Sequence, residues 1–475
     1  MSIQTPTNES TTSLNALLAK QRAAYLNVPY TTVDERIAKL KRLKKALISF
    51  QDEFITALNQ DFGNRAKEET LLLEVLPCVN QINYTVKRLK KWMKPERRHA
   101  GLMLAPAKVE VLHQPLGVIG IMVPWNGPVN LSIVPLITAI AAGNRAMIKL
   151  SEFTPATNTA IRALLAQVFD EDEVAIVEGE ADIAAQFSAL PFDHLLFTGA
   201  TEIGKHVMRA ASANLTPVTL ELGGKSPVII ANDIDMGIAV ERMAFAKCVN
   251  SGQVCISPDY VLCPAGKEQD FIDTYIARFK AMYNQATACN DHTSMVNDRQ
   301  YQRIKAWLED AKAKGATVVS ADGNDADDAS RRMATQLITN ATDDMKVLQE
   351  EIFGPLLPII PYNSMDEAIA YINTRPRPLA LYIMSFDKQV QNDVLTRTHS
   401  GGVCVNDTLF HFVADDAPFG GVGPSGMGHY HGKEGFLNFS KAKTVLSHGR
   451  FHVGKFIQPP YSESMVKLLL KIFLR

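Results

Sequence analysis

The fold is decided by residues 117–150, GVIGIMVPWNGPVNLSIVPLITAIAAGNRAMIKL, which predict a strand, a helix and a second strand. Gly117 to Val123 is almost wholly apolar, as buried strands are. Pro128 to Ala142 is an apolar segment of helical length, and Gly143-Asn144 ends it because these residue types favour the left-handed position after a helix. Ala146 to Leu150 predicts the next strand. This order is typical of parallel strands joined by a helix that packs on their sheet.

The same alternation extends in both directions. Elements of this kind follow at residues 154–168, 174–178, 183–190 and 195–198. A second alternating section begins after residues 228–230, with elements expected at 269–281, 298–314, 356–362, 368–373 and 380–386. Helical periodicity precedes them at 14–26, 33–58 and 68–93. Because 475 residues exceed what one hydrophobic core supports, we predict two doubly wound α/β domains that join near residues 222–228.

The composition excludes several classes of protein. Hydrophobic residues make up 46% of the chain, charged residues 21%, and the formal net charge is −1. Such a chain has no global field that attracts nucleic acid or an anionic membrane. The basic residues between Lys87 and Arg98 leave a local nucleic-acid contact open, but a solvated helix end accounts for them better. We therefore predict no nucleic-acid partner.

The cysteines and the N-terminus indicate a reducing compartment. Six cysteines stand at positions 78, 248, 255, 263, 289 and 404. None forms a CxxC pair and no Cys/His cluster has zinc spacing, so we expect reduced thiols and no metal site. The N-terminus lacks a signal pattern, and no run reaches the roughly 18 apolar residues of a membrane span. The expected location is the cytoplasm.

One cysteine stands in an unusual setting. Asn250-Ser251-Gly252-Gln253-Val254-Cys255 is a small, polar run between apolar segments, and some thirty residues upstream an apolar run ends at Glu221-Leu222-Gly223-Gly224-Lys225. A thiol nucleophile needs room for a substrate and a group that handles protons, and Cys255 and Glu221 can supply both. On these residues alone, a buried free cysteine and a surface glutamate remain an alternative.

Two further segments suit a nucleotide. The strand at 195–197 leads into Thr198-Gly199-Ala200-Thr201-Glu202-Ile203-Gly204, where a helix N-terminus can bind a pyrophosphate. The spacing is GxxxxG and not GxGxxG, so a plain strand-helix turn stays open. Lys149 ends another strand and Glu152 follows it. A carboxylate there can accept hydrogen bonds from ribose hydroxyls and would repel a 2′-phosphate.

At these motifs the chain resembles the aldehyde dehydrogenase superfamily. Residues 221–227 and 250–255 are similar to its two signatures, correctly ordered and spaced, and the resemblance extends from about residue 30 to 455. Segments 401–407, 418–423 and 425–433 resemble the class 3 branch, and residues 69–98 resemble its bacterial coniferyl aldehyde dehydrogenases. The fold implied is α/β: a Rossmann-type cofactor domain and a catalytic domain, both doubly wound, with a small β oligomerisation arm.

The resemblance divides the chain into segments. They are a disordered tail at 1–11, an NAD(P)-binding domain at 12–100 and 117–222, an oligomerisation arm at 101–116 and 442–458, a catalytic domain at 223–441 and a C-terminal tail at 459–475. The arm implies a homodimer, since exposed edge strands of this kind tend to be covered by a partner.

The resemblance also implies the chemistry. The Cys255 thiolate attacks an aldehyde, Asn126 and the Cys255 backbone N–H hold the oxyanion of the thiohemiacetal, and hydride transfer leaves a thioester. Glu221 then activates the water that releases the carboxylic acid. Relatives that pass the thioester to coenzyme A lack this glutamate, so its presence favours hydrolysis. Cys248 and Cys263 are expected to be structural.

The cofactor implied is NAD, with NADP as a second possibility. In the family the residue at Glu351 holds the nicotinamide ribose and the residue at Phe353 lies against the nicotinamide. The expected cofactor-binding residues are Trp125, Lys149, Glu152, Gly199, Thr201, Gly204, Leu222, Gly223, Glu351 and Phe353. Ala200 stands where the family usually has serine, which removes one side-chain contact and leaves the backbone cradle.

The substrate expected from the branch is an aromatic aldehyde such as coniferaldehyde. Trp125, Phe410, His411 and Phe412 are candidate walls of an aromatic pocket. Since an apolar pocket discriminates between aldehydes poorly, a medium- or long-chain aliphatic aldehyde is the alternative. A thioester or ester hydrolase without cofactor and a binding protein that retains the fold are two further alternatives.

The last twelve residues predict an amphipathic helix. Lys467, Lys471 and Arg475 share one face, and apolar residues from Met465 to Phe473 occupy another. Twelve residues are too few to span a bilayer. The helix is expected either to pack on its own protein or partner subunit, or to give weak peripheral membrane attachment.

Overall fold

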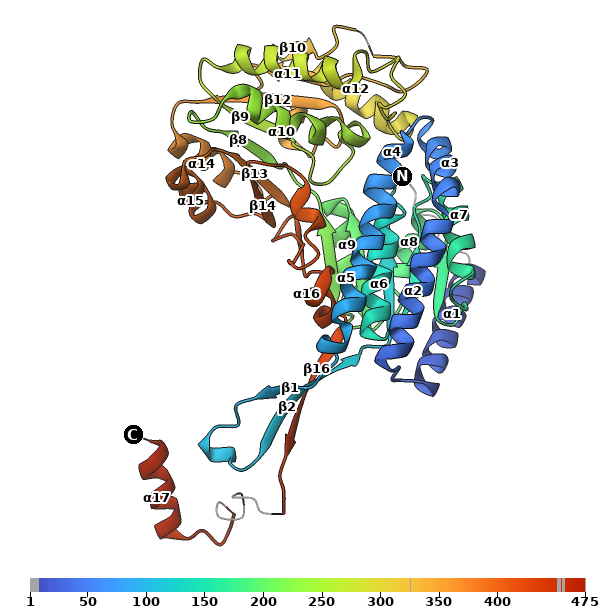
Figure 1. Ribbon diagram of the computed structural model, residues 1–475, viewed down its shortest axis with the longest axis vertical. Coiled ribbons are helices and arrows are strands. Elements are labelled where there is room, and N and C mark those ends of the chain that lie inside the picture. The colour runs from blue at the N-terminus through green and yellow to red at the C-terminus, as the bar shows by residue number, and fades with distance from the viewer. Residues whose placement is uncertain (1–7, 325, 451–453, 455–457, 475) are drawn as a thin grey trace.

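The computed structural model describes residues 8–324, 326–450, 454 and 458–474. Two α/β domains lie one above the other in Figure 1, and a slender arm extends from the lower domain. This arrangement confirms the fold class expected from the sequence. The alternating segments of the two chain halves form separate sheets, each with its own strand order.

The lower domain is built on a six-stranded sheet in the order β15-β7-β6-β3-β4-β5. Its strands are β3 (Val118–Met122), β4 (Arg145–Lys149), β5 (Val174–Val177), β6 (His194–Gly199), β7 (Val218–Leu222) and β15 (Gly426–Met427). All pairs are parallel except that of β15 with β7. Its helical segments are α1 (Asn8–Asn27), α2 (Val33–Ser49), α3 (Gln51–Phe62), α4 (Lys67–Glu69), η1 (Thr70–Val75), α5 (Leu76–Trp92), α6 (Asn130–Ala142), α7 (Pro155–Ala166), α8 (Ala181–Ser188), α9 (Thr201–Ser212) and α16 (Gly432–Asn438).

The upper domain is built on a seven-stranded sheet in the order β10-β11-β12-β9-β8-β13-β14. Its strands are β8 (Pro227–Ile230), β9 (Tyr260–Pro264), β10 (Thr317–Ser320), β11 (Gln336–Thr339), β12 (Leu356–Tyr362), β13 (Ala380–Met384) and β14 (Gly402–Val405). Only β10 runs antiparallel to its neighbour. Its helical segments are α10 (Met236–Cys248), η3 (Val249–Gly252), α11 (Glu268–Tyr283), α12 (Asp298–Ala313), α13 (Lys346–Gln349), α14 (Met365–Asn373), α15 (Lys388–Arg397) and η4 (Phe410–Val413).

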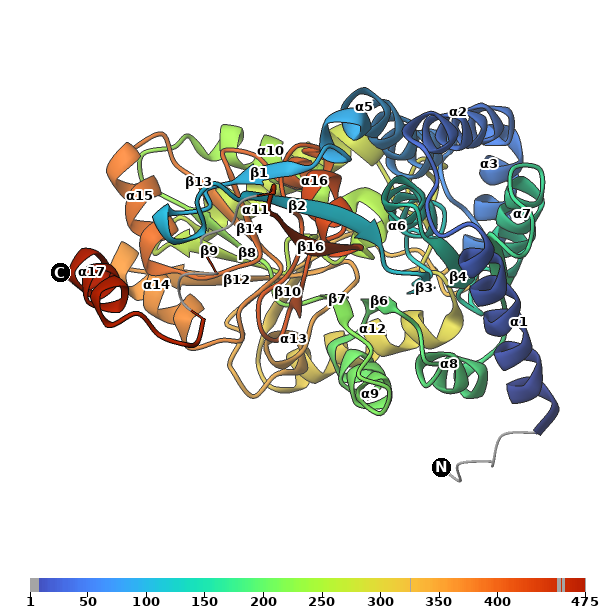
Figure 2. The same cartoon turned by 90° about the horizontal axis from the view of Figure 1, so that it is seen from below.

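The arm is a three-stranded antiparallel sheet of β1 (Glu96–Arg98), β2 (Lys108–Pro115) and β16 (Ser440–Ser447), with the short turn η2 (Leu102–Leu104). Strands β2 and β16 pair along their whole length, from Pro115 opposite Ser440 to Lys108 opposite Ser447. Figure 2 shows the arm from below, with α17 (Glu463–Phe473) beyond it at the C-terminal end. The arm therefore joins segments more than 300 residues apart in the chain.

Helix α6 shows why the segment at 117–150 governs the lower domain. All thirteen of its residues are buried, including Pro135, as expected of a helix that is apolar on every side. Gly143 ends it at φ 90°, and the Arg36 guanidinium lies where a side chain would stand. The Arg36 Nη1 donates to the Ala141 carbonyl at 2.9 Å, which satisfies one of the last acceptors of the helix.

The N-terminal segment differs from its sequence prediction. Helix α1 begins at Asn8, so the disordered tail expected at 1–11 is wrong for residues 8–11, while residues 1–7 lie outside the described chain. Leu14 and Leu18 are buried in the cluster that also contains Val118, and this apolar contact stabilises the helix. The helix expected over 33–58 is divided at Phe50 into α2 and α3.

The boundaries expected for the catalytic domain and the arm are also corrected. Gly426 pairs with Glu221 of β7, and α16 packs against α6 and α5, so the chain has returned to the lower domain well before residue 441. The physical reason is that β7 would otherwise be a bare edge strand. The arm includes β1 and begins again at Ser440, whereas residues 451–453 and 455–457 lie outside the described chain.

Candidate active site

Glu221 lies at the carboxyl end of β7, where the two domains meet. The residue is 3% exposed, and neither carboxyl oxygen has a hydrogen-bond partner within the described chain. Burial raises the pKa of Glu221 well above its usual value. The Cα of Gly420 approaches closely, since a methyl group there would stand 3.3 Å from Glu221 Oε1. A dry carboxyl group with a raised pKa is suited to accepting a proton near neutral pH.

The loop that carries Cys255 begins in a strained conformation. Asn250 and Ser251 both have left-handed backbones, at φ 50° and 54°, and Gly252 follows at φ 72°. A Cβ on Gly252 would meet the Gly354 carbonyl oxygen at 2.6 Å, so only glycine fits there. Strain of this kind persists only where the surroundings hold the backbone in place.

Hydrogen bonds from Gln253 provide part of that support. Its Nε2 donates to the Asn250 carbonyl at 2.9 Å and to the Ser294 carbonyl at 3.1 Å, and its Oε1 accepts from Val296 N at 3.0 Å. The glutamine side chain is fully buried. It thus fixes the backbone two residues before Cys255.

Asn126 meets this loop from the lower domain. Its Nδ2 donates to the Gln253 carbonyl at 3.1 Å, and its own backbone carbonyl accepts from Asn250 Nδ2 at 3.0 Å. The Asn250 amide also donates to the Gln253 carbonyl at 3.1 Å. The structure therefore brings together Asn126 and the Cys255 loop, which are some 125 residues apart in sequence.

Three charged residues that the sequence analysis missed hold this junction. Glu69 accepts the Asn250 N–H at 3.2 Å and the Thr293 hydroxyl at 2.6 Å. Glu74 pairs with Arg65 at 3.0 Å and accepts the N–H groups of Val129 and Asn130, at 3.1 and 2.8 Å. Arg65 Nη1 also lies 3.4 Å from the Asn126 carbonyl. All three side chains are buried.

The π-helical turn η1 explains how Glu69 and Glu74 serve one site. Its hydrogen bonds join residues five apart, as from Leu76 N to Leu71 O, so residues with this spacing lie about one turn apart. In an ordinary α-helix the same two carboxylates would point in different directions. The sequence signal available was Glu74 within Leu71-Leu72-Leu73-Glu74-Val75-Leu76, a lone charge in an apolar run.

Cys255 is partly buried, and Glu351 and Glu221 are its charged neighbours. Burial raises the pKa of its thiol to about 12, and the nearby charges of Glu351 and Glu221 act in the same direction. Cys248, by contrast, is buried in the core, with its Sγ 3.4 Å from the Tyr275 hydroxyl, and Cys263 is also fully buried. Both positions agree with structural roles.

The start of α9 forms an open cradle. A Cβ on Gly199 would meet the Phe197 ring at 2.6 Å, and one on Gly204 would meet the Leu222 side chain at 2.7 Å. Ala200 stands at the N-cap and contributes no side-chain acceptor, so the first N–H groups of α9 are not capped by it. Thr201 turns its hydroxyl to the Pro424 carbonyl at 3.1 Å. Uncapped N–H groups at a helix start favour an anion.

The other expected cofactor residues come from both domains. Lys149, at the end of β4, pairs with Glu152 at 3.2 Å. The Glu351 carboxylate lies against Gly223, and burial raises the pKa of Glu351 to about 8. Phe353 meets the Trp125 ring edge-on, with centroids 5.3 Å apart. The rings of Trp125 and Phe353 thus lie next to Asn126.

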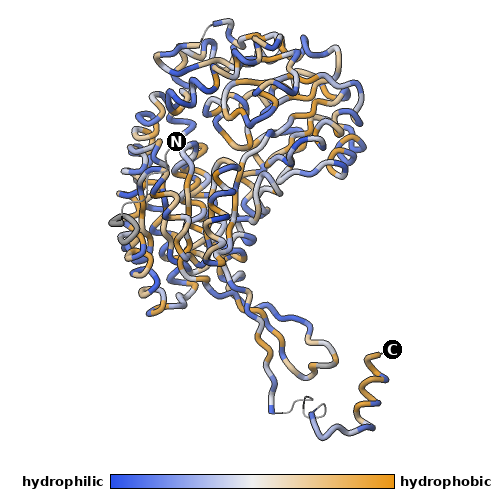
Figure 3. The backbone as a smooth tube through the Cα atoms, turned by 180° about the vertical axis from the view of Figure 1, so that it is seen from behind, coloured by the Kyte–Doolittle hydropathy of each residue, from blue (hydrophilic) through white to orange (hydrophobic). Residues whose placement is uncertain are grey.

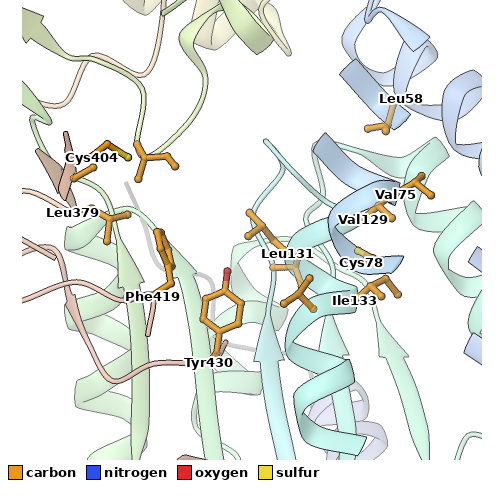
Figure 4. Close-up of a cluster of buried hydrophobic side chains, with 14 of the residues drawn as sticks. Leu58, Val75, Cys78, Val129, Leu131, Ile133, Leu379, Cys404, Phe419 and Tyr430 are labelled. Carbon is orange, nitrogen blue, oxygen red and sulfur yellow. The ribbon is translucent and has the colours of Figure 1, made fainter. Parts of the chain in front are cut away.

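Aromatic rings from the returning C-terminal segment complete the site. Phe419 lies 5.0 Å from Phe412 and stacks on His431 at 5.3 Å, and Tyr430 contacts His431 at 4.4 Å. In Figure 4 Tyr430 stands between Phe419 and Leu131. Phe410, another candidate wall residue, is 63% exposed. His411 and Phe412 do contact Phe419.

The sequence that carries this site matches a known family along nearly its whole length. The sequence model of the "Aldehyde dehydrogenase family" covers residues 2–445. The chain belongs to the aldehyde dehydrogenase family. Among curated relatives of this dehydrogenase, "Probable coniferyl aldehyde dehydrogenase" of Pseudomonas aeruginosa is 54% identical, with 97% of this chain and 96% of the relative covered.

Two other relatives confirm the branch expected from the sequence. "Coniferyl aldehyde dehydrogenase" of a Pseudomonas species is 44% identical, with 96% of this chain and 95% of the relative covered. "Aldehyde dehydrogenase family 3 member A2" of Rattus norvegicus is 38% identical, with coverages of 92% and 90%.

Solved structures agree with this assignment. A substrate-bound aldehyde dehydrogenase of Staphylococcus aureus is 37% identical, with a TM-score of 0.92 and coverage of 97% of this chain and 99% of the other. A Mycobacterium tuberculosis aldehyde dehydrogenase complexed with NAD+ is 27% identical, with a TM-score of 0.84 and coverages of 93% and 92%.

The raised pKa of the thiol gives a first prediction. Because only the thiolate alkylates, labelling of Cys255 by iodoacetamide in the free enzyme should be slow at pH 7 and rise about tenfold per pH unit below pH 10. Glu351→Gln removes a negative charge that disfavours the thiolate, so it should lower the thiol pKa and speed labelling several-fold at pH 9. Peptide mass spectrometry measures the rate. Glu350→Gln, at an exposed neighbouring residue, is the control. A rate that does not change with pH contradicts the prediction.

Proposed function

We propose that this aldehyde dehydrogenase oxidises an aromatic aldehyde of the coniferaldehyde type to its carboxylic acid, with NAD as cofactor. The observation that carries the proposal is the aromatic wall of Phe412, Phe419, Tyr430 and His431 beside the buried Glu221 carboxyl. The names of the coniferyl aldehyde dehydrogenases at 54% and 44% identity support the same substrate class.

In this proposal Cys255 is the nucleophile. The Cys255 thiol first loses its proton to solvent. The thiolate sulfur then bonds to the aldehyde carbon, and the π electron pair of the carbonyl moves to its oxygen, which becomes an oxyanion. An asparagine amide has two N–H groups, and one of those on Asn126 is used by the Gln253 carbonyl. The second remains for the oxyanion, together with the Cys255 backbone N–H. The rigid loop around Asn250 keeps these donors in place during the reaction.

The residues present fit NAD. The uncapped N–H groups at the start of α9 suit its pyrophosphate, and Glu152, held by Lys149, suits the hydroxyls of its adenine ribose. Glu351 and the Trp125–Phe353 pair suit its nicotinamide end. When bound, NAD supplies the acceptor for the hydride that leaves the thiohemiacetal carbon. The NAD+ complex of the Mycobacterium tuberculosis relative supports this choice.

Glu221 acts in the second half of the proposed reaction. It takes a proton from water while the water oxygen bonds to the thioester carbon and the Cys255 sulfur leaves. Glu221 must be ionised to accept this proton. The rate of hydrolysis should therefore decrease as the pH falls through the raised pKa of Glu221. Water attack follows oxidation, because the thioester has a carbonyl carbon to which water can add, whereas the thiohemiacetal carbon is already tetrahedral.

A substrate panel tests the proposed function. The increase in absorbance at 340 nm with NAD is measured for coniferaldehyde, benzaldehyde, decanal and hexadecanal. We expect the highest kcat/KM for coniferaldehyde. A higher value for hexadecanal would favour the fatty-aldehyde alternative, and ester cleavage without NAD-dependent oxidation of any aldehyde would favour the hydrolase alternative.

Glu221→Gln tests the order of the steps. We expect a burst of about one NADH per active site, followed by a steady rate reduced roughly 10²-fold or more, because acylation precedes the base-assisted step. Stopped-flow absorbance measures both phases. Cys255→Ala is the matched comparison and should give no burst while it still binds NAD. A steady rate equal to that of the wild type would remove Glu221 from its role.

Glu152→Thr tests the coenzyme site. It removes a carboxylate expected near the ribose 2′ position, so the ratio of kcat/KM for NADP to that for NAD should rise at least tenfold. Steady-state kinetics with both coenzymes measure it. Glu171→Thr, at an exposed glutamate paired with Lys20, is the control. If the NADP-to-NAD ratio of kcat/KM does not change, Glu152 does not contact the adenine ribose.

We also propose a homodimer formed through the arm. The β1 and β16 strands are the two edges of its sheet, and most of β16 is exposed within the single chain. A second copy related by a twofold axis would cover such an edge. Light scattering at micromolar concentration should give a mass of about 105 kDa, twice that of the 52.3 kDa chain. A mass near that of one chain contradicts the dimer.

For the C-terminal helix α17 we propose weak attachment to anionic membranes. No residue of α17 is buried, and Leu468, Leu470 and Ile472 are each about half exposed. Figure 3 shows this helix as a hydrophobic segment away from both domains. No helix in the described ranges is long and apolar enough to cross a bilayer. Co-sedimentation with anionic liposomes should be greater for the intact chain than for one ending at Tyr461, and equal binding contradicts attachment.

A further inference from the structure

Polar atoms without partners line a small cavity beside the aromatic wall. His431 is 3% exposed, and neither of its ring nitrogens has a hydrogen-bond partner in the described part of the chain. The same holds for Oδ1 of Asn130, which is 4% exposed. Both residues line a cavity of about 20 Å³ between α5, α6 and η4. That is room for one hydroxyl-sized group.

The Gln81 side chain, which also lines this cavity, can satisfy both of its polar atoms. With its amide nitrogen oriented toward Asp415, it donates to Asp415 Oδ1 at 2.7 Å and its oxygen accepts from Gly432 N at 3.1 Å. Asn130 itself donates through Nδ2 to the Leu73 carbonyl at 2.8 Å, which fixes the direction of its free oxygen. Leaving a buried polar group unpaired destabilises a protein, so such groups are rare unless they serve a ligand.

Burial lowers the pKa of His431 to about 3, so the ring is neutral at physiological pH. A neutral imidazole has one N–H donor and one acceptor nitrogen. Together with the Asn130 oxygen, the cavity therefore offers a donor and two acceptors. A hydroxyl group, which both donates and accepts, matches this set, whereas a methyl or methylene group matches none of it.

Ring contacts link His431, at the cavity wall, with residues near the reacting groups. Tyr430 precedes His431. Burial raises the pKa of Tyr430, and the charges of Glu221 and Cys255 act in the same direction. Phe419 stacks on the His431 ring, and the next residue, Gly420, lies against the Glu221 carboxyl. The rings of Phe419 and Tyr430 thus contact His431 at the cavity, and the segment that carries them also lies against Glu221.

We propose that His431 and Asn130 recognise the ring hydroxyl of a 4-hydroxyaryl aldehyde whose carbonyl carbon lies at Cys255. This inference rests on the proposed function and names the part of the substrate that the pocket selects. A site built to hydrogen-bond a hydroxyl rejects the analogue that lacks it, because its own buried polar groups are then left unpaired.

The test compares 4-hydroxycinnamaldehyde with cinnamaldehyde, which differ only in this hydroxyl. For the wild type, kcat/KM should be about tenfold higher for the hydroxylated substrate, the size expected of one to two buried hydrogen bonds. His431→Phe keeps an aromatic ring against Phe419 and removes both nitrogens. It should bring the ratio of the two kcat/KM values close to one, because the nitrogens that distinguish the two substrates are gone.

His292→Phe is the matched control. His292 is also buried and neutral, packs against Phe279 and Tyr283, and lies in the upper domain away from this cavity. This substitution should leave unchanged the ratio of kcat/KM for 4-hydroxycinnamaldehyde to that for cinnamaldehyde. A second measurement needs only the wild type: 4-hydroxycinnamate should inhibit about tenfold more strongly than cinnamate.

The outcomes separate the two proposals. Equal kcat/KM for both aldehydes in the wild type, or a ratio that His431→Phe leaves unchanged, overturns the hydroxyl site and leaves the proposed function standing. If the enzyme oxidises decanal but oxidises neither 4-hydroxycinnamaldehyde nor cinnamaldehyde, the proposed function is overturned, and the hydroxyl site with it. If His431→Phe does not fold, equal inhibition of the wild type by the two acids still overturns the hydroxyl site.

Discussion

The buried carboxylate of Glu69 reaches from the helical turn of the lower domain to the loop of the upper domain that carries Cys255. It accepts the N–H of Asn250, whose left-handed backbone costs of the order of 1–3 kcal/mol and needs such support. The same carboxylate binds the Thr293 hydroxyl, and the carbonyl of Thr293 accepts from Ser251. Because one side chain joins both domains at the strained turn, the position of the thiol depends on how the domains pack.

Removal from water sets the chemical character of the groups around this loop. Burial is the main reason that the pKa values of Glu221, Glu351 and the Cys255 thiol are raised in the free enzyme. The same burial lowers the pKa of His431 and keeps its ring neutral. One dry region therefore holds a thiol, a proton acceptor and a neutral hydrogen-bonding ring within a connected set of contacts.

The return of the C-terminal segment to the lower domain closes this region. Strand β15 covers the edge of β7 at Glu221, and the Tyr430 carbonyl accepts from the Thr138 hydroxyl of α6 at 2.8 Å. Phe419, Tyr430 and His431 lie on this returning segment. The contact that protects an edge strand thus also supplies the aromatic wall of the proposed substrate pocket.

The sequence by itself determined the alternating strands and helices, the apolar helix α6, and the candidates Asn126, Glu221 and Cys255, because these depend on local periodicity and on short motifs. Only the tertiary structure decided that Arg65, Glu69 and Glu74 are buried partners of the candidate active site and that His431 and Asn130 share one cavity. A charged or polar residue has the same local pattern whether it faces water or a partner two hundred residues away. Its role is set by burial and by long-range contacts, which exist only once the chain has folded.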